Sequence, residues 1–326
     1  MKLTAPNIFQ CHALRRAALA TFSTLTLFVT VQALSVPSAE AVTAKQSTYK
    51  SPQEAVDALV AAVKAGTADG IVAVLGPDGR ELASSGDPVA DQAARQRFEA
   101  AYDEAHELKQ EADTRTVLII GKDAFPFPIP VVAEAGAWRF DTEAGAREIL
   151  DRRIGENELA AIEVARAYVD AQREYAEADR DGKGVQYARK LLSTEGQKDG
   201  LYWPVSEGGD ESPMGPLVAN ARAQGYRRTA GTSAAPPYHG YVFKILTGQG
   251  NHATGGAINY VLNGRMIGGF ALVAAPAEYG NSGVMTFIVN HDGVVLEKDF
   301  GPDTSRAAAA MTVFDPDSTW SKVTSE

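Results

Sequence analysis

The stretch TVLIIGKDAFPFPIPVVAEAGAWRFD, residues 116–141, decides the fold class that the sequence predicts. Its apolar residues come in three short runs, 116–121, 128–134 and 137–141, which are β-branched or aromatic and are separated by glycine, proline or charge. Such runs indicate strands, and their short connections predict an antiparallel meander. In FPFPIP (125–130), Pro alternates with apolar residues, which suits an edge strand; a partner-docking surface is the alternative.

The residues before this meander have helical periodicity. Ser51 is the expected N-cap of a helix whose apolar stripe runs to Gly66. A short helix is expected at 70–76 and a third at about 89–108. Helices that pack against an antiparallel sheet predict an α+β domain over residues 42–150.

The chain after the meander predicts a second domain over residues 151–326. Residues 143–179 are expected to be almost wholly helical, with a break at 155–157, and to connect the two domains. A short helix is expected to end at Leu192, followed by a loop-rich stretch, 194–239. Four strands follow: YVFKILTG (241–248), GGFALVAAP (268–276), VMTFIVN (284–290) and VVLEKDF (294–300). The last two flank HDG and predict a hairpin, so this domain is also antiparallel α+β.

The first 41 residues have the layout of a secretory signal peptide. Basic residues precede an uncharged run, 17–34, and a small-residue pattern follows at 39–41. Cleavage after Ala41 predicts a periplasmic or secreted protein, and an uncleaved membrane anchor is the alternative. The pair Arg15-Arg16 leaves general secretion and twin-arginine export both open.

Composition excludes several classes of function. The only cysteine, Cys11, lies before the apolar run, so cleavage leaves no disulfide, cysteine nucleophile, iron–sulfur cluster or thiolate zinc site. The net charge is −10, and the predicted signal peptide removes more basic than acidic residues. Such a surface repels phosphate backbones, so no nucleic-acid partner is expected. After Ala41 no apolar run is long enough to span a bilayer.

The DRDGKG segment, residues 179–184, has the layout of the start of a calcium-binding loop, which needs oxygen ligands at loop positions 1, 3, 5 and 12. With Asp179 at position 1, Asp181 takes position 3, but Lys183 and Lys190 fall on positions 5 and 12. Because two ammonium groups replace two ligands, the segment is predicted to be a helix-terminating turn. Metal binding by Asp179 and Asp181 is the alternative, and no cofactor is predicted.

Four residues form candidate catalytic pairs of an imidazole and a carboxylate: His239, His291, Asp292 and Glu278. A carboxylate beside an imidazole can orient it as a general base. The tip NHDG, 290–293, is also explained fully by a hairpin turn. Three residues of PYHGY form a candidate ligand-binding cluster: Tyr238, His239 and Tyr241. The alternative for this cluster is a strand entry that packs aromatic rings on the core.

Both halves resemble known domain types. A first helix PQEAVDALVAAVKAG (52–66), a second helix ending near VLG and a late GAWRFD strand resemble the NTF2-like, cone-shaped α+β domains. Enzymes of that type use a pocket between sheet and helices, often with an Asp and a His inside; here the only histidine, His106, is expected on a helix rich in Glu and Lys. A long helix, DRDGKGVQYARKL, GYVFKI, FALVAAPAEYG and GVMTFIVNHDGVV resemble, in that order, the globular heads of pilin-like and pseudopilin-like bacterial proteins.

Taken from SPQEAVDALV to VNHDGVV, residues 51–295, the chain resembles an exported bacterial family catalogued as domain of unknown function 2950. The resemblance implies an envelope protein of unassigned activity and brings no catalytic residues.

Two functions follow from these observations. The first is a non-enzymatic envelope module that binds or scaffolds an envelope protein or a small ligand. The alternative is an envelope hydrolase with a site between the domains that uses His239 or His291 with Asp292 or Glu278. No G-x-S-x-G motif or phosphate-binding glycine loop occurs. Convergence of a histidine and a carboxylate in one pocket would favour the hydrolase, whereas a hydrophobic pocket of the first domain without titratable residues would favour small-ligand binding.

Overall fold

The computed structural model describes residues 45–324 except 181, 206–208 and 228–235. The predicted signal peptide and Asp181 therefore lie outside the described residues. No helix among the described residues is long and apolar enough to cross a membrane. The fold is α+β, as the sequence predicts, with helices packed against antiparallel sheets.

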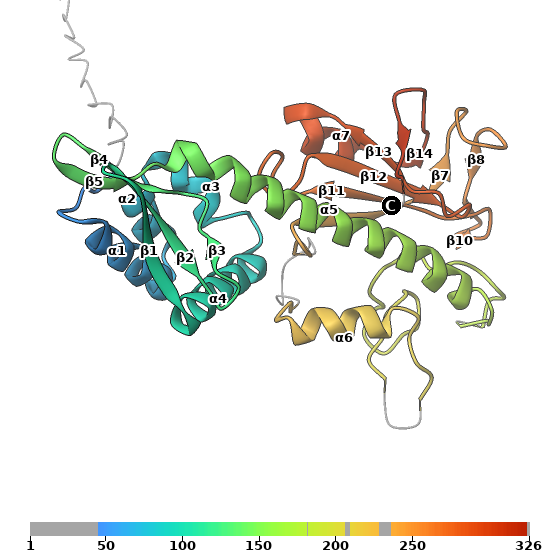
Figure 1. The fold of residues 1–326 in the computed structure, drawn as a ribbon. Helices are drawn as coiled ribbons and strands as arrows, with labels where there is room; N and C mark the ends of the chain where they lie inside the picture. The colour runs from blue at the N-terminus through green and yellow to red at the C-terminus, as the bar shows by residue number, and fades with distance from the viewer. Residues whose placement is uncertain (1–44, 181, 206–208, 228–235, 325–326) are drawn as a thin grey trace, which may run out of the picture. The chain divides into compact units, whose positions relative to one another are not determined.

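Helices and a five-stranded sheet make up most of residues 52–140 (Figure 1). In chain order they are α1 Pro52–Ala65, α2 Ala68–Leu75, the 3-10 helix η1 Pro77–Gly79, α3 Arg80–Ala83, α4 Pro88–Glu104, β1 His106–Ala112, β2 Arg115–Ile120, β3 Phe125–Pro126, β4 Val131–Glu134 and β5 Ala137–Phe140. The sheet order is β1-β2-β4-β5, β3 pairs with β2, and every pairing is antiparallel. The predicted antiparallel meander is confirmed.

The predicted start of α1 is confirmed by its hydrogen bonds. Ser51 is extended, and its hydroxyl accepts a hydrogen bond from the Glu54 amide over 3.2 Å. Gly66 ends the helix with φ +68°, a left-handed conformation that glycine adopts without a Cβ clash. Six residues turn the apolar face of α1 into the core: Ala55, Val56, Leu59, Val60, Ala62 and Val63.

The prediction that the third helix extends to residue 108 is wrong. Helix α4 ends at Glu104, and His106 begins β1 instead of lying on a helix. Strand β1 pairs with β2 from His106 opposite Ile120 onward and is mostly exposed. The alternating charges of HELKQEA suit the solvent-facing side of an edge strand as well as a helix surface, so the pattern alone does not separate the two. The His106 ring stacks on Tyr102, with centroids 3.9 Å apart.

Helix α5 is continuous over Thr142–Tyr175, so the predicted break at residues 155–157 is wrong. Gly155 keeps helical geometry, and a Cβ there would meet nothing within 4 Å. Asn157 does not form a turn, because its side chain is buried and donates to the Ser282 carbonyl over 2.9 Å. Tertiary packing therefore overrides the local turn propensity of these residues.

The remaining elements form a second sheet with smaller sheets beside it. They are α6 Gly215–Ala223, β6 Tyr241–Leu246, β7 Gly248–Gln249, β8 Ile258–Asn259, β9 Val261–Leu262, β10 Arg265–Met266, β11 Ala271–Pro276, β12 Met285–Asn290, β13 Leu296–Asp299, η2 Gly301–Asp303, α7 Thr304–Ala310, β14 Val313–Phe314 and β15 Ser321–Lys322. The larger sheet has the order β15-β13-β12-β11-β6 and is antiparallel throughout. Helix α5 packs against β11 and β12.

The predicted hairpin between β12 and β13 is confirmed, with Gly293 at φ +80°. Another turn, Asn263-Gly264, joins β9 to β10 with both residues at positive φ, as an Asn-Gly hairpin requires. The helix predicted to end at Leu192 is absent from the described residues of that segment. Instead, the Ala188 amide and carbonyl both bond to the buried side chain of Gln172, which holds the segment extended.

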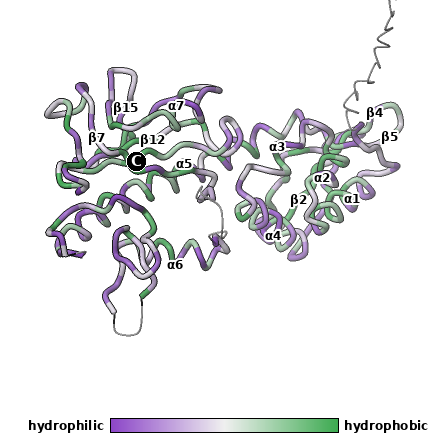
Figure 2. The backbone as a smooth tube through the Cα atoms, turned by 180° about the vertical axis from the view of Figure 1, so that it is seen from behind, coloured by the Kyte–Doolittle hydropathy of each residue, from purple (hydrophilic) through white to green (hydrophobic). Residues whose placement is uncertain are grey.

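Two hydrophobic clusters lie within the described residues. One gathers apolar side chains from α1, α2 and the first sheet, including Leu59, Leu118 and Phe140. The other surrounds β11 and β12 and includes Tyr168 of α5 and Phe287. Figure 2 colours the stretch around α2 largely as hydrophobic, in agreement with its burial in the first cluster.

Candidate functional site

A groove of about 370 Å³ opens in the C-terminal half and is called the C-terminal groove below. Its walls come from β12, β13, the end of α7 and the segment after it. The lining residues are Ile288, Lys298, Phe300, Ala307, Ala310, Met311, Thr312, Val313, Asp315, Asp317 and Trp320. The groove therefore combines apolar walls with two carboxylates and one ammonium group.

An aromatic pair and a lysine organise the groove. The rings of Phe300 and Trp320 meet edge to face, with centroids 5.6 Å apart and planes at 75°. The Lys298 ammonium lies 4.7 Å from the Phe300 centroid and 5.9 Å from the Trp320 centroid. Lys298 and Phe300 are two residues apart, so an extended backbone directs both side chains to the same face of the sheet. The cation is attracted by both rings.

The two carboxylates of the groove are fixed by their neighbours. Asp315 accepts hydrogen bonds from the His252 amide over 2.8 Å and lies 3.0 Å from the His252 Nδ1. Asp317 accepts from the amide and hydroxyl of Thr319. These hydrogen bonds, with the nearby charges of Lys298 and His252, hold the pKa of Asp317 below its usual value. Asp317 therefore stays an ionised acceptor near neutral pH.

A second polar cluster, called the Asp87 cluster, joins α4 to the segment before β6. Asp87 is 1% exposed, and one carboxylate oxygen caps α4 by accepting from the Val89 and Ala90 amides. Its other oxygen accepts from the Tyr226 hydroxyl and the Gly240 amide, each over 2.9 Å. Four donors satisfy this buried carboxylate, as a charge removed from water requires.

Arg153 and Asn281 add a second set of bonds beside this cluster. Arg153 donates to the carbonyls of Glu81 and Leu82 and to the Asn281 side chain over 2.6 Å. Asn281 in turn donates to the Ser84 carbonyl and to Glu278. Burial lowers the pKa of the Arg153 guanidinium, and the charges of nearby carboxylates partly offset this. The set links α5, α3 with the residue after it, and the loop before β12.

The candidate ligand-binding residues separate in the structure. The rings of Tyr238 and His239 lie 4.4 Å apart and both contact Tyr226 of the Asp87 cluster. Tyr241 is fully buried in the core, and its hydroxyl donates to the Met285 carbonyl over 2.8 Å. His239 has φ +48°, and burial lowers the pKa of its imidazole despite the nearby carboxylate of Asp87.

The candidate catalytic residues lie on three different loops. His291 Nε2 is 3.8 Å from an Asp292 oxygen, and its ring packs edge to face on Tyr260. Glu278 accepts from Asn281 and lies against Gly86. Within the described residues, no hydrogen bond or ion pair joins the His239 imidazole to a carboxylate. The hydrolase site therefore remains a prediction that rests on these separate positions.

The structure gives the DRDGKG segment a turn. Asp179 accepts a hydrogen bond from the Lys183 amide over 3.0 Å, and Gly182 and Gly184 have φ +74° and +92°. Positive φ at two glycines is what a sharp change of chain direction needs. In the described part of the chain, no group of three or more metal-binding side chains occurs.

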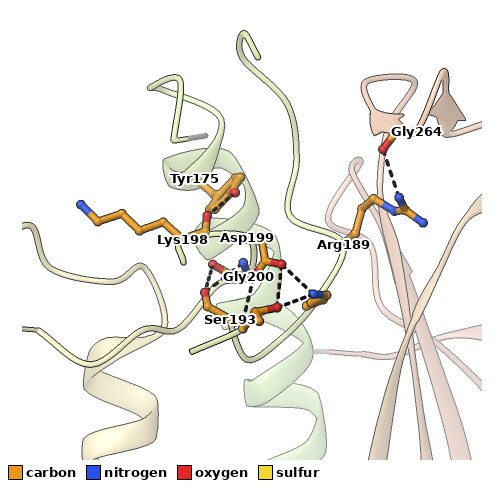
Figure 3. A network of polar contacts seen from close by, with 9 residues as sticks. Tyr175, Arg189, Ser193, Lys198, Asp199, Gly200 and Gly264 are labelled. Atoms are coloured by element: carbon orange, nitrogen blue, oxygen red, sulfur yellow. Dashed lines mark hydrogen bonds and ion pairs between the residues drawn. The ribbon is translucent and has the colours of Figure 1, made fainter. Parts of the chain in front are cut away.

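Lys190, which takes loop position 12, is bound elsewhere. Its ammonium donates to an Asp199 oxygen over 2.6 Å and to the Thr194 hydroxyl over 2.7 Å, while Asp199 also accepts from the Thr194 amide. Figure 3 shows this network, with Asp199 beside Ser193 and Gly200 and the Tyr175 hydroxyl on the Lys198 carbonyl. Despite some burial, these hydrogen bonds lower the pKa of Asp199. The network fixes a loop and leaves Lys190 engaged.

A smaller cavity of about 140 Å³ lies beneath the helices of the first half. Most of its wall is apolar, from residues that include Leu59, Ile71 and Phe127, but Asp91, Arg95 and Arg153 also line it. The condition stated for small-ligand binding, a hydrophobic pocket without titratable residues, is not met here.

The sequence did not single out the residues that organise the Asp87 cluster or the C-terminal groove. Asp87 precedes Pro88, a pattern typical of a helix N-cap, but its bonds to Tyr226 and Gly240 have no local signal. Trp320 stands in a short polar tail, and its contact with Phe300 depends on how β15 returns to β13.

Comparison with known proteins identifies the family. A family model described as protein of unknown function (DUF2950) matches residues 46–323, and the chain belongs to that family. The family resemblance expected from the sequence is confirmed. No curated protein and no solved structure matches the chain.

Proposed function

We propose that this DUF2950 protein is an exported, non-enzymatic module that binds a small ligand in the C-terminal groove. The observation that carries the proposal is the aromatic pair of Phe300 and Trp320, which lines a groove of about 370 Å³ together with a small set of charged groups. Ligand pockets commonly have volumes of about 300–1,000 Å³ and combine apolar walls with a few polar groups that set orientation.

The order of the groove supports a binding role. Lys298 is held over both rings, Asp315 is held by His252, and Asp317 is held by Thr319. Side chains that are already fixed lose little conformational entropy when a ligand arrives. The groove thus offers a preorganised surface for a small molecule.

Export belongs to the same proposal. The charge and hydropathy of residues 1–41 favour a secretory signal peptide, so the module would meet its ligand, or an envelope protein, in the periplasm or outside the cell. Cell fractionation of the full chain, with and without residues 2–41, tests this part. Retention of the full chain in the cytoplasm would contradict it.

A fragment screen by ligand-observed NMR tests the groove. We expect small aromatic and polyhydroxylated fragments to bind the wild type and to lose about tenfold or more in affinity with Trp320→Ala or Phe300→Ala. Phe125→Ala is the matched control, because Phe125 is 41% exposed and belongs to the other sheet. Equal loss in all three variants, or no binding by any fragment, would refute the proposal.

The hydrolase is retained as a second candidate because of the backbone at His239. A non-glycine residue at positive φ is uncommon, and such strain is found disproportionately at active sites. Its imidazole is biased toward the neutral form that a general base needs. Hydrolysis of peptide or ester substrates that disappears with His239→Asn, but not with His252→Asn, would support this candidate over the binding module.

A further inference from the structure

The charges of the C-terminal groove restrict what it can bind. One ammonium group, on Lys298, faces two carboxylates, on Asp315 and Asp317. The Lys298 ammonium already lies over both aromatic rings. A cationic ligand would have to displace it from the site that attracts cations most strongly.

An anionic ligand fits no better. Asp315 and Asp317 would repel it, and both are held as acceptors by hydrogen bonds from neighbouring residues. The single ammonium would have to leave its two rings in order to pair with the added charge. Among the described residues that line the groove, Lys298 is the only lysine or arginine, so no second ammonium or guanidinium group is there to offset this repulsion.

We infer that the C-terminal groove binds a neutral carbohydrate, with a sugar ring against Trp320 and Phe300 and hydroxyls on Asp315, Asp317 and Lys298. This inference rests on the proposed binding function and names its ligand class. The geometry combines an apolar surface for the C–H face of a sugar with charged acceptors and a donor for its hydroxyls.

The side chains of the groove match the chemistry of a neutral sugar. Sugar hydroxyls are donors and acceptors at once, so ionised carboxylates accept from them and an ammonium donates to them, in strong charge-assisted bonds. The C–H groups of a pyranose present an apolar face that is favourable to bury against an aromatic ring. A neutral ligand that packs on ring surface not covered by Lys298 also leaves this cation in place and the charge balance of the groove unchanged.

The edge-to-face aromatic arrangement suits such a ligand. Because the planes of Phe300 and Trp320 meet at 75°, they form two walls of a corner instead of one flat platform. Thr312 also lies among the lining residues. The volume of about 370 Å³ accommodates one or two sugar rings.

The test is a titration of the full chain with three neutral disaccharides, cellobiose, maltose and N,N′-diacetylchitobiose, followed by NMR saturation transfer and calorimetry. Glucosamine and glucuronic acid serve as a cationic and an anionic probe. We expect at least one neutral disaccharide to bind and both charged sugars to bind more weakly by about tenfold or more.

Variants separate the groove from adventitious binding. We expect Trp320→Ala and Asp317→Asn to lower the affinity for the neutral sugar by about tenfold or more, whereas Phe125→Ala leaves that affinity unchanged. Lys298→Met keeps the aliphatic stem and removes the cation. This variant should bind a neutral sugar more weakly, because a hydrogen-bond donor is lost. It should bind a cationic ligand more tightly, because the ring faces become free for the ligand's charge. Circular dichroism of each variant checks that it is folded.

The outcomes distinguish this inference from the proposed function. If charged or aromatic fragments bind at Trp320 while no neutral disaccharide does, the carbohydrate inference fails and the binding module stands. If neither sugars nor fragments bind the wild type, both fail. If a neutral disaccharide binds equally well to the folded Trp320→Ala and Asp317→Asn proteins, the groove is not its site and the inference is overturned.

Discussion

The Tyr226 hydroxyl donates a hydrogen bond to the Asp87 carboxylate over 2.9 Å, although 139 residues separate the two in the chain. The same hydroxyl accepts from the His239 amide over 3.2 Å. Tyr226 thus bridges the cap of α4 and the segment that leads into β6. Burial, together with the adjacent Asp87 carboxylate, raises the pKa of the Tyr226 phenol, so the hydroxyl keeps its proton.

Removal of this hydroxyl should destabilise the protein. Tyr226→Phe leaves one oxygen of Asp87 with fewer donors and the His239 amide without its acceptor, in surroundings where Asp87 is 1% exposed. A buried group that loses its partner costs about 1–3 kcal/mol. We expect the free energy of unfolding to fall by about that amount in urea titrations.

Tyr238→Phe is the matched control for this prediction. Within the described residues the Tyr238 hydroxyl makes no hydrogen bond, although its ring contacts Tyr226 at 4.8 Å. We expect a change of less than about 0.5 kcal/mol. Equal effects of the two substitutions would mean that the hydroxyl bridge does not stabilise the fold.

The protein should lose stability in mild acid through His239. Burial lowers the pKa of this imidazole below the ordinary value of 6.5, and the charges of Asp87, Glu163 and Glu156 offset only part of the shift. The folded state binds the proton less readily than the unfolded chain does. The contribution of the neutral imidazole to the free energy of unfolding is therefore fully present above the pKa of the unfolded state. It is lost as the pH falls through the lower folded pKa. An NMR titration of the imidazole should give a midpoint below that of an unfolded peptide.

His239→Asn provides the control for this pH dependence, since asparagine tolerates the positive φ at this position. Between about pH 7.5 and about pH 5, the variant should lose less stability than the wild type. Parallel pH profiles for the two proteins would show that another group causes the acid sensitivity.

The local parts of the fold were predictable because they depend on short-range rules. The cap at Ser51, the left-handed end at Gly66 and the turns at Gly293 and Asn263-Gly264 each follow from one residue type and its neighbours. Two of the wrong predictions, the break at 155–157 and the helix ending at Leu192, have a common physical cause. The side chains of Asn157 and Gln172 hydrogen-bond to Ser282 and Ala188, which lie 125 and 16 residues further along the chain, outside the range of local patterns.

The site was harder to predict for the same reason. Sequence reasoning named histidines near carboxylates only as candidates, and the His291 Nε2 lies 3.8 Å from an Asp292 oxygen. The Phe300–Trp320 pair and the Tyr226–Asp87 bond are contacts between distant segments, for which one sequence has no periodic signal. Only the packing of strands and loops brings these residues together.

Calcium should leave the DRDGKG turn unchanged. The Asp179 carboxylate already accepts from the Lys183 amide, and Lys190 is bound to Asp199. We therefore expect the melting temperature to be the same in millimolar calcium and in excess chelator. Calorimetry with calcium chloride on the wild type and on Asp181→Ala completes the test. Stoichiometric binding that this substitution removes would show that the segment holds a metal.

Two glycines of α5 should respond to alanine in opposite directions. At Gly145 a Cβ would lie 2.5 Å from the Pro128 carbonyl carbon and 2.7 Å from the Ile129 nitrogen, and neither backbone atom can move aside easily. We expect Gly145→Ala to lower the free energy of unfolding by about 2–3 kcal/mol. At Gly155 a Cβ would meet nothing within 4 Å. There alanine removes backbone freedom from the unfolded chain and should stabilise by about 0.5–1 kcal/mol.

The opposite signs make this pair informative, because both substitutions add the same methyl group to the same helix. If Gly155→Ala destabilised the protein, α5 would have to bend at that glycine, as its sequence alone predicts. If Gly145→Ala were stabilising as well, the first turn of α5 would not lie against residues 128–129. Urea titrations of the two variants beside the wild type therefore test both the continuity of α5 and the contact that anchors its start.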